Sequence, residues 1–196
     1  MKDLSKILNH IGEDRESYFN AVAPPIFQTS NFSFNSVHEL RSSLDKEYEI
    51  PFYTRGNNPT VAILRKKLAA LEGTEDALVF ASGCAAIAAA VMSVVKNGDH
   101  VVCVKKPYSW TQKLFQNYLT DYGVETTMVD GTNVENFRLA IKGNTTLIYL
   151  ETPNSITFEL QDLKAIGKLA KKHQITTVCD NSYSTPLYQR PAELGI

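Results

Sequence analysis

Apolar and polar residues follow a regular pattern only from Thr60 onward. Short apolar runs bounded by turn residues, typical of buried strands, alternate there with longer stretches at helical spacing. Strands in this order predict an α/β fold with a mostly parallel sheet and helices on both faces. The expected strands are 77–80, 100–104, 124–129, 145–150 and 175–179, and the expected helices are 60–72, 84–96, 109–121, 133–142 and 160–173.

Residues 1–59 show no sustained period, and one short helix is expected near 36–47. The segment is interrupted by residues that break regular structure, namely Pro24, Pro25, Pro51, Gly56 and Pro59. We therefore divide the chain into an extended N-terminal arm, 1–59, which depends on a partner surface, and a regular domain, 60–196.

The composition of the chain argues against several classes of partner. Twenty basic and twenty-one acidic residues give a net charge of −1, which argues against a nucleic acid or an anionic membrane as partner. The most apolar run, 85–95, is shorter than the roughly 20 residues that cross a bilayer. The three cysteines are far apart and lack C-x-x-C spacing, so we expect a reduced, cytoplasmic protein.

Common catalytic and binding motifs are also missing from the sequence. The four histidines have no metal-ligand spacing, so we expect no metal site. Neither G-x-G-x-x-G after the first regular strand nor a P-loop motif occurs, and no G-x-S-x-G motif indicates a serine hydrolase.

In parallel sheets, ligands bind at the carboxyl ends of the strands, so the residues after each strand are the candidates. Ser82 and Gly83 precede a helix whose first N–H groups are free to bind an anion such as phosphate. Taken alone, this stretch favours the simpler interpretation, in which Ser82 is an ordinary N-cap and Gly83 forms a tight turn. Tyr108 and Trp110 follow the next strand, and aromatic side chains there either stack on a flat ligand or cover the core.

The last two strands end in polar groups. Glu151, Asn154 and Ser155 follow strand 145–150, and Asp180 follows strand 175–179. Taken by itself, each of these residues is explained as a turn former. Together, an anion site, an aromatic ring, polar groups and a carboxylate suit pyridoxal phosphate. A carboxylate beside its ring nitrogen keeps that nitrogen protonated, and the protonated ring withdraws electrons.

Five ordered motifs resemble the trans-sulfuration, or Cys/Met-metabolism, family of pyridoxal-phosphate enzymes. The resemblance covers nearly the whole chain, including the arm at 23–34, and it implies a fold-type I architecture. It is carried by YTRGNNPT (53–60), ASGCAAI (81–87), PYSWT (107–111), ETPNS (151–155) and CDNSYSTPLYQRPAELG (179–195).

The resemblance implies a role for each matching residue. Gly83 and the backbone of Cys84 would cradle the phosphate, with Ser82 beside them. Tyr108 would stack on the ring and assist proton transfers. Asp180 would pair with the ring nitrogen.

Three further positions complete the implied site. Ser182 would contribute a hydroxyl near the phosphate or the ring. Tyr53 and Arg55 would reach across a subunit interface to a neighbour's phosphate, so a homo-oligomer built as a dimer of dimers is expected.

Some positions depart from the family pattern. The ring-contacting asparagine of the family falls on Ser155, with Asn154 displaced by one, so either residue is a candidate for that contact. Trp110 replaces a small residue and is expected to narrow the substrate entrance. The lysine that carries the cofactor in the family, which lies beyond QRPAELG, is not expected among the lysines of this chain.

The function implied by the resemblance is β/γ-elimination or γ-replacement on amino acids derived from cysteine or homoserine, in the manner of cystathionine γ-synthase and cystathionine lyases. The chain itself would be a fragment without its catalytic lysine. Two alternatives stay open: a non-catalytic fragment or pseudo-enzyme that assembles with a full-length partner, and another fold-type I activity such as an aminotransferase.

Overall fold

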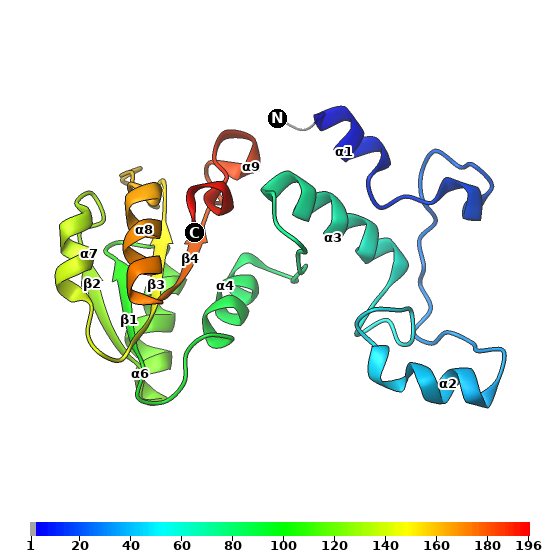
Figure 1. Ribbon diagram of the computed structural model, residues 1–196, viewed down its shortest axis with the longest axis horizontal. Coiled ribbons are helices and arrows are strands. Elements are labelled where there is room, and N and C mark those ends of the chain that lie inside the picture. Colours follow the sequence, from blue (N-terminus) through cyan, green and yellow to red (C-terminus); the bar gives the residue numbers. More distant parts are fainter. Residues whose placement is uncertain (1–2) are drawn as a thin grey trace. The chain divides into compact units, whose positions relative to one another are not determined.

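The computed structural model describes residues 3–196, which divide into two compact units, one ending at Val79 and the other spanning Phe80–Ile196. Each unit is considered by itself. Figure 1 labels helices and strands of both units. In the described residues, no helix combines the length and the apolar character needed to cross a membrane.

The first unit is helical and irregular. Its elements are α1 (Leu4–His10), η1 (Arg15–Tyr18), α2 (Val37–Ser43), η2 (Leu44–Lys46) and α3 (Pro59–Glu72). The short helix expected near 36–47 is confirmed as α2 and η2, and the helix expected at 60–72 is confirmed as α3. Helix α1, which the sequence analysis does not predict, packs on α3 and buries Ile7.

Side-chain hydrogen bonds tie the extended arm to the start of α3. The Asn58 side chain caps α3 and donates to the carbonyl of Phe27, with a distance of 2.9 Å. Thr60 donates through its hydroxyl to the carbonyl of Pro25 at 3.0 Å. Helix α3 therefore belongs to the same unit as most of the arm, although the sequence analysis groups it with the regular domain.

The second unit is a parallel sheet in the order β2-β1-β3-β4. Its central strands carry almost entirely buried side chains, as expected for strands covered on both faces. The strands are β1 (His100–Val104), β2 (Glu125–Val129), β3 (Thr145–Glu151) and β4 (Thr176–Asp180). The predicted α/β fold with a parallel sheet is confirmed.

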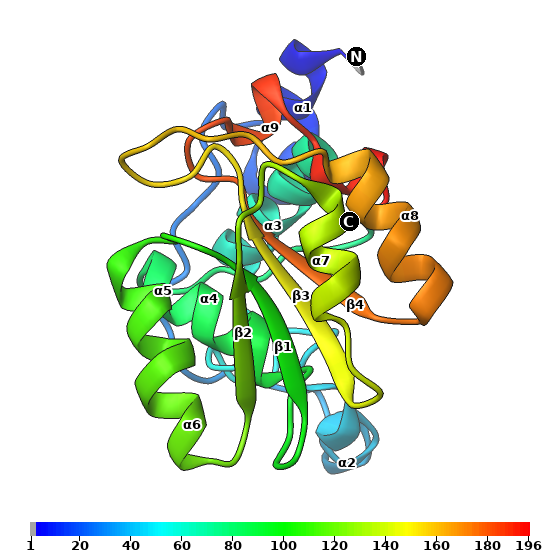
Figure 2. The same ribbon diagram turned by 90° about the vertical axis from the view of Figure 1, so that its left-hand side faces the viewer.

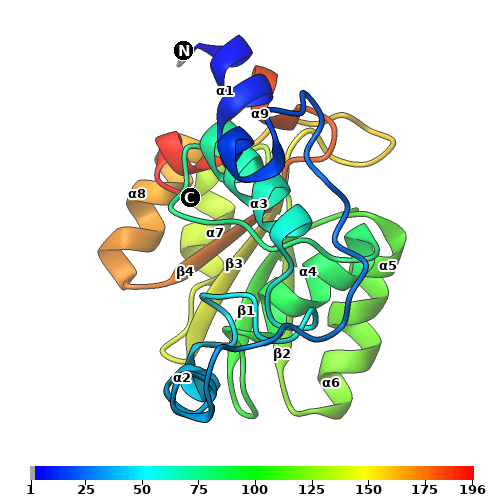
Figure 3. The same ribbon diagram turned by 90° about the vertical axis from the view of Figure 1, so that its right-hand side faces the viewer.

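Helices cover both faces of this sheet. On one face lie α7 (Val134–Ala140) and α8 (Leu163–His173), as Figure 2 shows. Their apolar side chains pack around Ile148 and Leu150. On the other face lie α4 (Gly83–Met92) and a continuous helical run made of α5 (Ser109–Lys113), the π-helical η3 (Leu114–Tyr118) and α6 (Leu119–Asp121) (Figure 3). The short α9 (Thr185–Tyr188) and η4 (Pro191–Leu194) follow β4.

One expected strand is wrong. Residues 77–80, which the structure describes in full, form no strand, and Leu78, Val79 and Phe80 are exposed. An apolar run becomes a strand only where a neighbouring strand pairs with its backbone. No described strand pairs with this segment.

Candidate functional site

A cavity of about 450 Å³ lies where β3 and β4 end. Its size is within the usual range for a small-molecule site. It is lined by Ser82, Gly83, Cys84, Ile87, Tyr108, Glu151, Ser155, Asp180, Ser182 and Tyr183. Residues predicted from four separate segments of the sequence are thus brought together around one space.

The amino end of α4 forms one wall of this cavity. The Ser82 hydroxyl accepts a hydrogen bond from the N–H of Ala85 at 3.2 Å, which makes Ser82 the N-cap. The N–H groups of Gly83 and Cys84 have no helical acceptor, because they belong to the first turn. Apart from its two neighbours in the chain and the backbone of its own helix, no atom of the described residues lies within 4 Å of a Cβ built on Gly83. An anion therefore has both donors and room at this end of α4.

Two carboxylates from neighbouring strands also line this cavity. Glu151 and Asp180 end neighbouring strands and are partners in the β3–β4 register. One Asp180 oxygen, Oδ1, accepts from the N–H of Ser182 at 2.9 Å. Because both carboxylates line the same cavity, its potential favours a positively charged group such as a protonated ring nitrogen.

Tyr108 enters the cavity from the loop after β1. Its side chain is partly exposed, and its backbone N–H donates to Glu151 Oε2 at 2.7 Å. The N–H of Ser155 donates to the other oxygen, Oε1, at 2.6 Å. The sequence analysis notes Glu151 as a polar group but does not include it among the cofactor contacts. Its position at the end of a buried strand was the signal available.

Asn154 and Ser155 differ in where they point. Asn154 is fully buried, and its amide nitrogen donates to the carbonyls of Lys105 and Lys106 at 3.3 and 3.2 Å. Its amide oxygen accepts from Gln161 at 2.7 Å. Ser155 lines the cavity, and Asn154 is not among the lining residues.

Tyr53 and Arg55 belong to the first unit. The Arg55 guanidinium forms an ion pair with Glu47 at 2.7 Å and lies 4.8 Å from the centre of the Tyr53 ring. The Arg55 side chain is 72% exposed. It therefore remains accessible to an anion from outside the unit, as the predicted contact with a neighbouring subunit requires.

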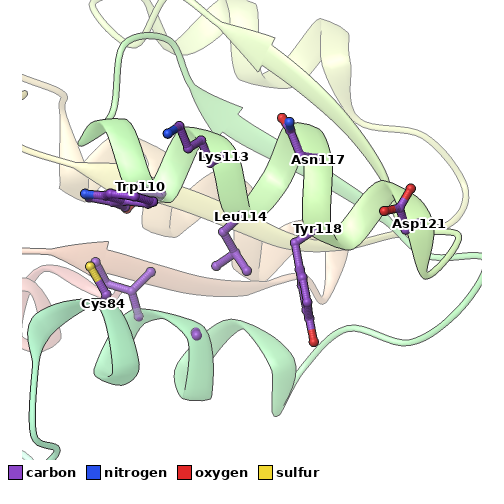
Figure 4. Close-up of a pocket in the computed structure, with 10 residues that line it drawn as sticks. Cys84, Trp110, Lys113, Leu114, Asn117, Tyr118 and Asp121 are labelled. Carbon is purple, nitrogen blue, oxygen red and sulfur yellow. The ribbon is translucent and has the colours of Figure 1, made fainter.

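A second cavity, of about 500 Å³, lies between α4 and the α5–α6 run. Figure 4 shows Leu114 and Tyr118 pointing toward α4, with Trp110 and Cys84 at one end. The Lys113 ammonium lies 4.3 Å from the centre of the Trp110 ring. Both cavities include Cys84 and Ile87 in their walls. This second space is mostly apolar, so the first cavity, with its carboxylates and helix end, is the candidate site for chemistry.

The chain matches the family model described as Cys/Met metabolism PLP-dependent enzyme over residues 5–196. It is 41% identical over 186 residues to a probable cystathionine γ-synthase of Herpetosiphon aurantiacus, covering 95% of this chain and 56% of that protein. It is 38% identical over 188 residues to an L-methionine γ-lyase of Treponema denticola, covering 95% of this chain and 47% of that protein.

Solved structures give the same result. The metB protein of Corynebacterium glutamicum superimposes with a TM-score of 0.91 at 34% identity, over 100% of this chain and 49% of that one. A putative O-acetylhomoserine (thiol)-lyase of Campylobacter jejuni, which contains a pyridoxyl-lysine-5′-monophosphate, superimposes with a TM-score of 0.92 at 26% identity, over 100% of this chain and 48% of that one. The chain spans about half the length of these relatives. It belongs to the Cys/Met-metabolism family of pyridoxal-phosphate-dependent enzymes.

Proposed function

We propose that this chain supplies the cofactor-binding residues of a pyridoxal-phosphate enzyme of sulfur amino-acid metabolism. Its substrates are amino acids derived from cysteine or homoserine, and a β or γ substituent is eliminated or replaced. The observation that carries the proposal is the single cavity that joins the amino end of α4, Tyr108 and Asp180.

Each wall of the cavity has a role in this proposal. The N–H groups of Gly83 and Cys84 hold the phosphate, with Ser82 as the cap and Ser182 nearby. Asp180 holds a proton on the ring nitrogen, because a carboxylate stabilises the cation beside it. When bound, pyridoxal phosphate supplies an electron-withdrawing ring that stabilises negative charge on the substrate.

Two contacts with the ring complete the arrangement. Tyr108 stacks on one face of the ring and excludes water from it. Ser155, rather than Asn154, contacts the ring hydroxyl, since Ser155 lines the cavity and the amide of Asn154 is already bound by protein groups.

The phosphate also receives an arginine in this proposal. Arg55 and Tyr53 act on the cofactor of a neighbouring subunit, because a guanidinium makes paired hydrogen bonds with phosphate and stays charged. The protein is accordingly a homo-oligomer, a dimer of dimers.

A non-catalytic chain that assembles with a full-length partner is a second candidate, favoured by the absence of lysine among the described residues that line the cavity.

The test uses two matched aspartates. Asp180 ends β4 and accepts from the N–H of Ser182, and Asp130 comes directly after β2 and accepts from the N–H of Thr132, both at 2.9 Å. Asparagine keeps the oxygen that accepts this bond but loses the charge. Asp180→Asn should weaken pyridoxal-phosphate binding by about 10- to 100-fold, the loss expected for a charged hydrogen bond. Asp130→Asn, outside the cavity wall, should bind normally.

Binding is measured through the fluorescence of Trp110, the single tryptophan of the chain. This residue lies two positions after Tyr108, so a ring bound in the cavity should quench it. Equal affinities for the Asp180→Asn variant and the unchanged chain would contradict the assignment of Asp180 to the ring nitrogen.

A further inference from the structure

Glu151 is a buried carboxylate with two backbone donors. Only 2% of the residue is exposed, and its two oxygens accept separately from the N–H groups of Tyr108 and Ser155, at 2.7 and 2.6 Å. None of the ion pairs found in residues 3–196 involves it. The negative charge is therefore stabilised by hydrogen bonds, which are strong when the acceptor is ionised.

These two bonds join different parts of the cavity wall. Tyr108 lies in the loop after β1, whereas Ser155 lies in the loop after β3, and both residues line the cavity. One side chain thus sets the positions of two loops relative to each other. It does so at the two residues whose side chains are proposed to contact the ring.

A neutral network already holds the same loops together. Asn154 donates to the carbonyls of Lys105 and Lys106, and Gln161 donates to Asn154. Holding the two loops together therefore does not by itself require a buried charge. Burying a charge costs free energy, because the charge has to be removed from water. The Glu151 bonds differ from this network because they end on residues that line the cavity.

We propose that Glu151 is a positioning residue, which fixes Tyr108 and Ser155 in the orientation that receives the cofactor ring. This inference rests on the proposed function, since it assigns the cavity to pyridoxal phosphate. Glu151 acts through Tyr108 and Ser155, by holding their backbones.

Glu151→Gln tests the role with little change of shape. A glutamine side chain has one accepting oxygen, and its NH₂ group cannot accept, so one of the two backbone donors loses its partner. We expect pyridoxal phosphate to bind about 10-fold more weakly, and the circular dichroism of the saturated complex in the cofactor absorption band to fall. Glu159→Gln is the control, because Glu159 follows the same strand but its side chain is 41% exposed. That variant should match the unchanged chain in both measurements.

Glu151→Asp distinguishes the effect of side-chain length from the effect of side-chain charge. Aspartate keeps the charge but is one methylene shorter, so it cannot bridge both donors, and its complex should resemble that of Glu151→Gln. If aspartate restores the affinity and the circular dichroism of the unchanged chain, charge alone is sufficient and the positioning role is overturned.

Amide hydrogen exchange without cofactor separates this inference from the proposed function. In Glu151→Gln, the amide of Tyr108, of Ser155 or of both should exchange about 10-fold faster, while amides in β1 and β3 stay protected. Unchanged exchange at both amides would overturn the role of Glu151, whatever the cofactor measurements show. The opposite result is also possible: the unchanged chain does not bind pyridoxal phosphate, but the amides still exchange faster in Glu151→Gln. That result would overturn the proposed function and would still support the bridging of the two loops by Glu151.

Discussion

Two adjacent residues show how sharply the environment changes within one loop. Asn154 is fully buried and makes hydrogen bonds through both ends of its amide, whereas Ser155 is half-buried and lines the candidate cavity. Their sequence spacing leaves both as candidates for the ring contact. The choice depends on the path of the loop backbone, which spacing alone does not determine.

Substitutions of Asn154 and Ser155 should affect different properties: the first should lower stability, and the second should weaken cofactor binding. Asn154→Ala should lower the free energy of unfolding by about 2–3 kcal/mol, because it leaves buried hydrogen-bonding groups without partners. Ser155→Ala should change that free energy by less than about 0.5 kcal/mol and should weaken pyridoxal-phosphate binding several-fold. Urea unfolding and cofactor titration, both followed by Trp110 fluorescence, measure the two effects. Normal cofactor binding by Ser155→Ala would remove Ser155 from the site.

At the scale of elements, β1 begins with a buried histidine, at the end of the strand opposite to the loop that carries Tyr108. His100 is fully buried, and its ring nitrogens lie 2.7 Å from the Thr145 hydroxyl and 2.8 Å from the Thr127 hydroxyl. Burial lowers the pKa of His100, and the positive charge of Lys142 lowers it further, while Glu125 acts in the opposite direction. The folded chain therefore binds a proton on His100 less readily than the unfolded chain does.

This difference predicts how stability depends on pH. The stability contribution of neutral His100 is complete above the ordinary histidine pKa of about 6.5 and is lost as the pH falls toward the lowered folded value. The slope from this residue should be positive as the pH rises, and its upper limit is about 1.4 kcal/mol per pH unit, the value for one proton. Urea unfolding followed by Trp110 between pH 5 and about pH 8 measures it. His100→Gln should reduce the slope, and His38→Gln, at an exposed position in the other unit, should not.

Element prediction from the sequence succeeded where a segment's own pattern decides the outcome. Continuous apolar runs correctly predict β1 and β3, because both strands are buried on two faces. The run at 77–80 has similar composition but no strand beside it among the described residues. Helix α1 was missed although Asp3 caps it and Leu4, Ile7 and Leu8 have helical spacing, because seven residues give a weak periodic signal.

At the scale of the whole molecule, the candidate site is concentrated in one unit. Every residue that lines the cavity belongs to Phe80–Ile196, whereas Tyr53 and Arg55 belong to the other unit. The parallel order of the strands makes this clustering predictable, since their carboxyl ends meet at one edge. The role of Glu151 was not predictable, because its two hydrogen bonds depend on how separate loops approach each other.

The last prediction concerns how the 196-residue chain holds its cofactor. No lysine of the described residues lines the cavity, so binding should be reversible and should not involve a covalent bond. Pyridoxal phosphate and pyridoxamine phosphate, which has no aldehyde, should therefore bind with affinities within about threefold of each other, a difference of less than about 0.7 kcal/mol. Borohydride treatment followed by intact-mass and peptide analysis should find no stoichiometric adduct on a single lysine. Such an adduct, together with much tighter binding of the aldehyde, would show that a lysine of this chain reaches the site and would contradict the proposal that the catalytic lysine is absent.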